Sequence, residues 1–152
     1  MTSSALDRAR DGSEQAFREL ARRFGQAFSD DDVDGLVELL TDDAWLAMPP
    51  APHEYLGPVA IGDFWRSSAA GRAGRRFRLV PTHANTQPAF ACYLPDHPGG
   101  PAPFTGVVVL TLAGPGVGGV TRFLDRDLAH PFGLSPFLEP AAAEGPLEAG
   151  AR

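Results

Sequence analysis

The hydrophobic pattern changes once along this chain, and that change limits the possible folds more than any other feature. Between Ser13 and Ser29 the apolar side chains recur every three or four residues, which is the spacing of one helix face. Beyond about Arg76 they form short alternating runs, separated by connections rich in Gly and Pro. Helices followed by strands predict an α+β domain, with the helices on one face of the sheet. The first helix carries Phe17, Leu20, Phe24 and Phe28, and strands are expected at 76–84, 88–94, 104–112 and 117–124.

Two further helices and one short strand are expected between these regions. The run from Ser29 to Asp32 ends the first helix and supplies a cap for a second one over 33–40. A strand at 44–48 stops at Pro49-Pro50, and 59–69 has the pattern of a third helix. We therefore predict a curved, mostly antiparallel sheet bent around helices, which leaves a conical hollow suited to a small molecule.

The length of the chain predicts one domain, since 152 residues can bury a single sizeable core. We expect this domain to cover residues 13–137. Residues 1–12 are polar and are expected to form a flexible N-terminal tail. Residues 138–152 have the composition of a disordered C-terminal tail.

Composition excludes several classes of function. A formal net charge of -6 argues against nucleic acid as a partner. No stretch of about 18 apolar residues exists, so no membrane span is expected, and the N-terminal stretch lacks the apolar segment of a signal peptide. Cys92 is the single cysteine, which precludes an intrachain disulfide and favours a cytoplasmic location.

The sequence also carries no pattern for a metal or a cofactor. The four histidines, His53, His83, His97 and His130, are scattered and lack a metal-binding spacing. The glycines at 114–119 form a hairpin turn rather than a phosphate-binding loop, because no helix follows them. We expect neither a metal nor a cofactor.

The stretches TDDAWLAMPP (41–50) and GPVAIGDFW (57–65), in this order of elements, resemble the SnoaL-like branch of the nuclear-transport-factor-2-like fold. The resemblance covers roughly Phe17 to Leu134. A closer likeness is to the C-terminal SnoaL-like domain of some extracytoplasmic-function sigma factors, and it rests in part on 78–96 (RLVPTHANTQPAFACYLPD) and 120–125 (VTRFLD). The resemblance implies a cone of N-terminal helices packed on a curved sheet.

The same stretches resemble ketosteroid isomerase, and that family's catalytic roles can be placed on this sequence. Its base falls on Met48, its oxyanion-hole tyrosine on Phe24 and its oxyanion-hole acid on Val108. A thioether cannot take a proton from carbon near neutral pH, and Phe and Val donate no hydrogen bond to an enolate. The chain is therefore not expected to be a ketosteroid isomerase.

The resemblance also implies which side chains line the hollow and bind the ligand. The cavity would be mostly aromatic and aliphatic, which suits a flat or polycyclic apolar molecule. Strand alternation agrees with the last part of the set, since Thr121, Phe123 and Asp125 share one face. The expected ligand-binding residues are Phe24, Phe28, Leu46, Met48, Trp65, Leu110, Thr121 and Phe123.

Three residues are candidates for catalysis. Asp125 would be the general acid or base, as the resemblance to SnoaL-like cyclases implies, although it could instead cap a final helical turn. His83 faces inward if the alternation from the preceding apolar residues continues, but a bulge at Pro81 would leave Thr82 inward instead. Tyr55 lies in the loop at the pocket mouth, where it could donate a hydrogen bond or pack as part of a lid.

These expectations support two principal hypotheses. The first is a cofactor-independent SnoaL-like enzyme, a cyclase, isomerase or hydrolase, that acts on an apolar and for example polyketide-like metabolite. The alternative is a non-catalytic module that binds a small apolar molecule and is related to the accessory domain of sigma factors. A third idea is an interaction domain that uses the outer face of the sheet, carrying Trp45, Arg122 and Leu124. A homodimer is expected, as is common in this fold.

Overall fold

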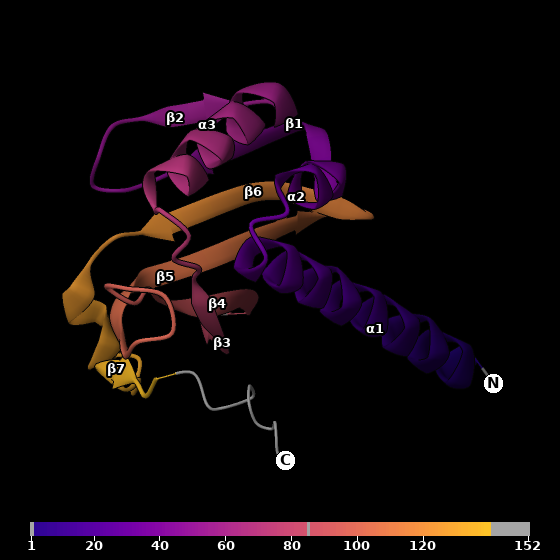
Figure 1. The fold of residues 1–152 in the computed structure, drawn as a ribbon. Coiled ribbons are helices and arrows are strands. Elements are labelled where there is room, and N and C mark those ends of the chain that lie inside the picture. Colours follow the sequence, from indigo (N-terminus) through magenta and orange to yellow (C-terminus); the bar gives the residue numbers. More distant parts are fainter. Residues whose placement is uncertain (1, 85, 141–152) are drawn as a thin grey trace, which may run out of the picture.

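A computed structural model describes the backbone of residues 2–84 and 86–140 and shows three helices packed on a curved, mostly antiparallel sheet (Figure 1). The predicted α+β fold class is confirmed. The helices are α1 (Thr2–Ser29), α2 (Val33–Leu39) and α3 (Pro58–Gly71). The strands are β1 (Leu40–Ala47), β2 (Glu54–Leu56), β3 (Arg78–Ala84), β4 (Gln87–Tyr93), β5 (Ala102–Ala113), β6 (Gly116–Phe123) and β7 (Phe137–Leu138), with a short 3₁₀ turn η1 (Arg126–Ala129).

The sheet has the strand order β2-β1-β6-β5-β4-β3, and β7 pairs with β5. The pairing of β1 with β6 is parallel, and the other pairings are antiparallel. The register places Val120 opposite Leu46 on one side and Leu110 on the other. These three side chains are buried in one cluster, so they mark the sheet face that the helices cover.

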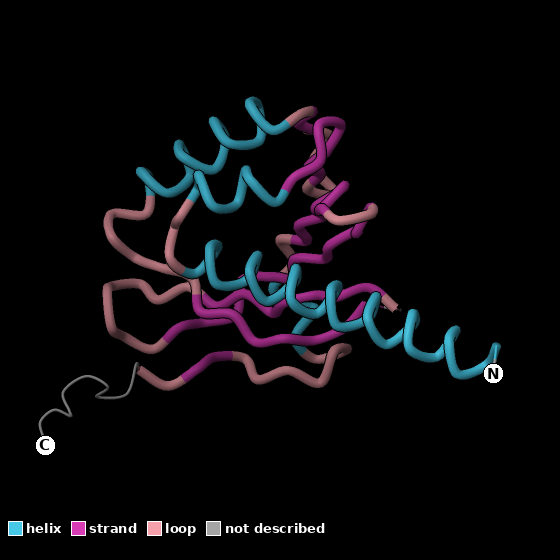
Figure 2. The backbone as a smooth tube through the Cα atoms, turned by 90° about the vertical axis from the view of Figure 1, so that its right-hand side faces the viewer, coloured by secondary structure: helices cyan, strands magenta, loops and turns pink. Residues whose placement is uncertain are grey.

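The first helix is longer than the sequence pattern predicts. It begins at Thr2 rather than at Ser13, so the residues expected to form a flexible tail continue the helix. Figure 2 shows the N-terminal part of α1 extending past the edge of the sheet. This stretch has no regular apolar face, but its Ala, Arg and Leu residues are good helix formers. The predicted disordered tail falls mostly on residues 141–152, which lie outside the described residues.

Both faces of the sheet carry a core. The helix-facing core contains residues of α1, α2 and α3 packed on the inward side chains of the strands. The outer core lies on the opposite face, where Val107 and Val109 of β5 pack with Tyr93 and Phe104. The segment after β6 covers this outer core with Leu128, Phe132, Leu134 and Leu138. Burial of β5 on both faces explains its nearly continuous apolar sequence.

No helix among the described residues is long and apolar enough to span a membrane.

Candidate functional site

The expected conical hollow is filled by aromatic side chains of the chain itself. Phe24 stacks on Phe28 with 5.9 Å between ring centroids, and it meets Trp65 edge-on at 6.0 Å. Phe28 in turn lies 5.3 Å from Phe77. Phe24 is completely buried. These rings occupy the space in which the sequence pattern placed a ligand.

The three positions that correspond to isomerase catalytic groups lie in apolar surroundings. Phe24, Met48 and Val108 are all buried, and none carries an ionisable side chain. Leu46 is buried as well, in the helix-facing core. Of the predicted ligand-binding residues, Phe24, Leu46 and Met48 line neither of the two cavities described below. They act as packing residues.

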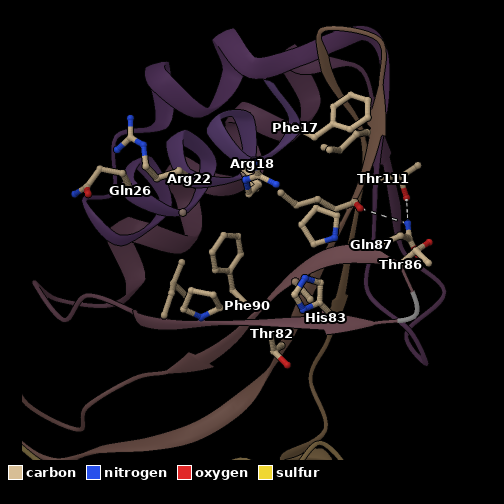
Figure 3. A pocket seen from close by; sticks show the side chains of 18 of the residues that line it. Phe17, Arg18, Arg22, Gln26, Thr82, His83, Thr86, Gln87, Phe90 and Thr111 are labelled. Carbon is tan, nitrogen blue, oxygen red and sulfur yellow. Dashed lines mark hydrogen bonds between the residues drawn. The ribbon is translucent and has the colours of Figure 1, made fainter. Parts of the chain in front are cut away.

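A large groove lies elsewhere, between α1 and the β3–β4 hairpin (Figure 3). Its volume is about 930 Å³. We call it the α1–β4 groove. At one end of the groove α1 packs closely on the sheet, since a Cβ on Gly25 would lie 2.9 Å from the ring of Phe90. The groove is lined in part by Phe17, Arg18 and Ala21 of α1, and by Leu79, His83, Phe90 and Leu110 of the sheet.

His83 reaches this groove from β3. The pairing of β3 with β4 runs without a register shift from Arg78 to Ala84, so no bulge forms at Pro81. Alternation therefore continues, and His83 lies on the α1 side of the sheet while the side chain of Thr82 points to the opposite face (Figure 3). Of the two alternatives, His83 is thus the residue on the α1 side, where its side chain lines the groove and is exposed. No carboxylate among the described residues forms a hydrogen bond with it.

Two polar side chains of the groove are held by neighbours. The guanidinium of Arg22 donates to both carboxylate oxygens of Glu19, at 2.9 and 2.8 Å. The Gln87 side-chain amide donates to Thr111 Oγ1 at 2.9 Å and to the Leu110 carbonyl at 3.3 Å. Glu14 and Arg18 also line the groove, but apolar side chains make up most of its lining. The groove is therefore suited to an apolar molecule with few directed hydrogen bonds.

The side of β6 that was predicted to face the ligand lies on the outer face of the sheet, away from the helices. Thr121 and Phe123 do share a side, but Phe123 packs on the outer core rather than on the helix-facing one, and Asp125 lies beyond the end of β6. The inward residues are Val120 and Arg122, because the register aligns Arg122 with the inward-facing Val108. The prediction that Thr121 and Phe123 face the ligand is wrong for this reason. Arg122 likewise does not belong to the outer face.

Asp125 is an exposed cap residue. Its carboxylate accepts a hydrogen bond of 2.9 Å from the backbone N–H of Asp127 and so begins the turn η1. It lines neither cavity. An exposed carboxylate lacks the apolar environment on which the predicted acid–base role depended. The alternative role as a cap is the one that the geometry supports.

Tyr55, the third predicted catalytic residue, stacks on Phe64 of α3 with 4.7 Å between ring centroids. It packs against the helix-facing core and lines neither cavity. Of the three candidates, only His83 therefore lies in a cavity. Cys92 is fully buried, and this burial raises the pKa of its thiol to about 11, which makes it unreactive near neutral pH.

Sequence reasoning missed an interior cation. Arg122 points between the helices and the sheet, where its guanidinium lies 4.6 Å from the ring centre of Phe77 and 5.7 Å from that of Phe28. Alternation from Val120 was the available signal, but a charged residue in a strand is normally expected outside. Stacking on aromatic rings is what permits the inward orientation.

Comparison with known proteins agrees with this architecture. The family model of the SnoaL-like domain matches residues 21–117. The RNA polymerase sigma factor SigG of Mycobacterium tuberculosis, of the extracytoplasmic-function class, is 35% identical over 138 residues, which are 89% of this chain and 36% of that protein. The chain thus spans little more than a third of the length of this curated relative.

Solved structures show the same fold at low sequence identity. An NTF2-like protein of Mesorhizobium loti has a TM-score of 0.58 at 21% identity, covering 73% of this chain and 92% of that one. A candidate polyketide cyclase of Sinorhizobium meliloti has a TM-score of 0.53 at 19% identity, covering 68% and 93%. The family match, together with the three helices on a curved sheet, identifies this chain as a member of the SnoaL-like domain family, with the nuclear-transport-factor-2-like fold.

Proposed function

We propose that this chain is a non-catalytic SnoaL-like module that binds a small apolar molecule in the α1–β4 groove. One observation carries the proposal: the large cavity has a mainly apolar lining, and the one predicted catalytic residue within it, His83, is not oriented by a carboxylate of the described residues. A general base is normally held in place by such a partner. Apolar walls with few directed polar groups are the features of a binding site.

The comparisons support the same proposal from a different direction. The similarity to SigG covers 89% of this chain, so the module resembles part of a transcription factor. In such a protein a SnoaL-like module would sense a metabolite rather than convert it. A ligand bound between α1 and the hairpin would stabilise their observed arrangement, which is a route by which binding can bias a neighbouring domain.

A titration with the apolar fluorophore Nile red tests the binding proposal. Phe17 is 43% exposed at the groove, and Phe137 is 51% exposed on β7, so the two make a matched pair. Covering the free part of the Phe17 ring is worth about 1 kcal/mol, or roughly fivefold in affinity. We expect Phe17→Ala to weaken Nile red binding by about that factor and Phe137→Ala to leave it unchanged. Equal affinity in both variants would exclude the groove as the binding site.

The natural ligand can be sought by incubating the chain with a fractionated bacterial metabolite extract and following free and retained compounds by mass spectrometry. A compound that is retained unchanged and competes with Nile red supports a binding module. Disappearance of a compound with appearance of a product of the same mass, or of that mass plus water, would instead reveal a cyclase, an isomerase or a hydrolase.

The second candidate function is an enzyme that acts on an apolar, for example polyketide-like, metabolite in the same groove. The observation that favours it is the position of the His83 side chain in the groove, because histidine is the side chain that most often serves as a general acid or base. For this candidate, His83→Gln should abolish product formation while retaining binding of the compound. Turnover that survives in this variant would remove His83 from the mechanism.

A further inference from the structure

A second, smaller cavity lies inside the protein, beneath the turn that joins α1 to α2. Its volume is about 10 Å³, which is room for about one water-sized group. Its lining includes Phe28, Asp31, Trp65, Ser68, Arg72 and Arg122. It shares no lining residue with the α1–β4 groove, so it is a separate site.

Arg122 brings a positive charge to this cavity. Its Nε is buried and has no hydrogen-bond partner among the described residues. The guanidinium stacks on two aromatic rings, which compensate its charge only in part. Burial lowers the pKa of Arg122. A buried donor without an acceptor costs free energy, and an anion placed within reach would recover it.

A second arginine adds to the positive potential. The guanidinium of Arg72 lies 4.7 Å from the ring centre of Phe77, over which Arg122 also lies. Arg72 donates to the Ser68 hydroxyl at 3.0 Å and is paired with the carboxylate of Asp31. Its charge disfavours the protonated form of Arg122 further. Two guanidinium groups thus face one carboxylate at this cavity, and among the described ion pairs none includes Arg122.

We infer that Arg122 and Arg72 form a binding site for a carboxylate ligand, and that Asp31 occupies part of this site when the ligand is absent. The cavity alone is too small for a carboxylate group beside Asp31, so the ligand would enter by displacing the Asp31 side chain. Asp31 can move outward, because it lies in a partly exposed turn between two helices. Arginine suits the role, since its fork of N–H donors matches the two carboxylate oxygens.

Trp65 provides a local signal for binding, because its ring lines the cavity. The chain has two tryptophans, so a Trp45→Phe background leaves Trp65 as the single indole fluorophore. Sodium acetate and its neutral isostere acetamide are titrated into this variant in separate experiments. The bulky anion HEPES holds the ionic strength constant. We expect a saturable change in Trp65 fluorescence and a raised melting temperature with acetate but not with acetamide.

Three variants in this background locate the site. Arg122→Met should weaken acetate binding by at least about tenfold, since it removes charge-assisted hydrogen bonds. Asp31→Asn should strengthen binding, since the competing carboxylate is gone. Arg126→Met makes the same change at an exposed position outside the cavity and should have no effect.

The inference is overturned if acetate and acetamide behave alike, or if Arg122→Met binds acetate as well as the parent. Should Arg122→Met fail to fold, the comparison of acetate with acetamide in the parent and in Asp31→Asn still decides the question. Nile red binding in the α1–β4 groove is measured separately, so either site can be refuted without the other.

Discussion

Replacing Phe24 by alanine should destabilise the protein strongly, because this ring fills the cone. Phe24 is fully buried, and burial of a whole Phe side chain contributes about 1.5–3 kcal/mol. Its contacts with Phe28 and Trp65 add about 0.5–1.5 kcal/mol each. The removed ring would leave a void that the surrounding side chains close only partly. We therefore expect Phe24→Ala to lower the free energy of unfolding by about 3–5 kcal/mol.

Urea denaturation followed by far-UV circular dichroism measures this change. Phe17→Ala is the matched control, since Phe17 is on the same helix and is 43% exposed; it should cost less than about 1 kcal/mol. The void should also bind benzene, which would raise the midpoint of Phe24→Ala by more than that of the parent, since both share the α1–β4 groove. A loss below about 1.5 kcal/mol for Phe24→Ala, with no effect of benzene, would refute the conclusion that aromatic side chains fill the cone.

Three further changes probe other parts of the fold. Gly106 has φ +150, and a Cβ there would lie 2.0 Å from the Phe123 carbonyl oxygen, so Gly106→Ala should lower the free energy of unfolding by at least about 3 kcal/mol in a urea titration. Gly71→Ala is the control and should not destabilise, because a Cβ there meets nothing within 4 Å. An equal loss of stability in both variants would contradict the argument. Burial raises the pKa of Cys92 from 9.0 to about 11, so the folded protein holds this proton more tightly than the unfolded chain does. The free energy of unfolding should therefore fall by about 2–3 kcal/mol as pH rises from about 9 to about 11. A decline of the same size in Cys92→Ala would exclude the thiol as its cause. Asp125→Ala should cost about 1 kcal/mol through the lost cap and leave Nile red binding unchanged, whereas weaker binding would restore Asp125 as a site residue.

The two proposed binding sites differ in how much the structure must rearrange before a ligand can bind. The α1–β4 groove is open as it stands, so binding there requires little rearrangement. The arginine cavity requires that the Asp31–Arg72 ion pair be broken first, so its ligand should bind more weakly and more selectively. Both cavities are bounded by the C-terminal half of α1. A ligand in either one would therefore restrain the helix that projects beyond the sheet.

Much of the fold could be predicted because each element carries a local pattern. The apolar stripe of Phe17, Leu20, Phe24 and Phe28 predicts a helix, and Gly- and Pro-rich connections separate the strands. The start of α1 could not be predicted in this way. Residues 2–12 form no regular apolar stripe, so no periodicity marks the start of the helix.

The sites depended on the tertiary structure. The sequence by itself determined that Thr121 and Phe123 share one side of a strand, because side chains alternate with a period of two. Only the register of β6 between β1 and β5 decided which side that is, and it turned Arg122 inward. A shift of one residue exchanges the two faces of a strand, and no local pattern fixes that shift when both faces are buried. In the same way, only side-chain packing decided that the cone is filled and that the open cavity lies between α1 and β4.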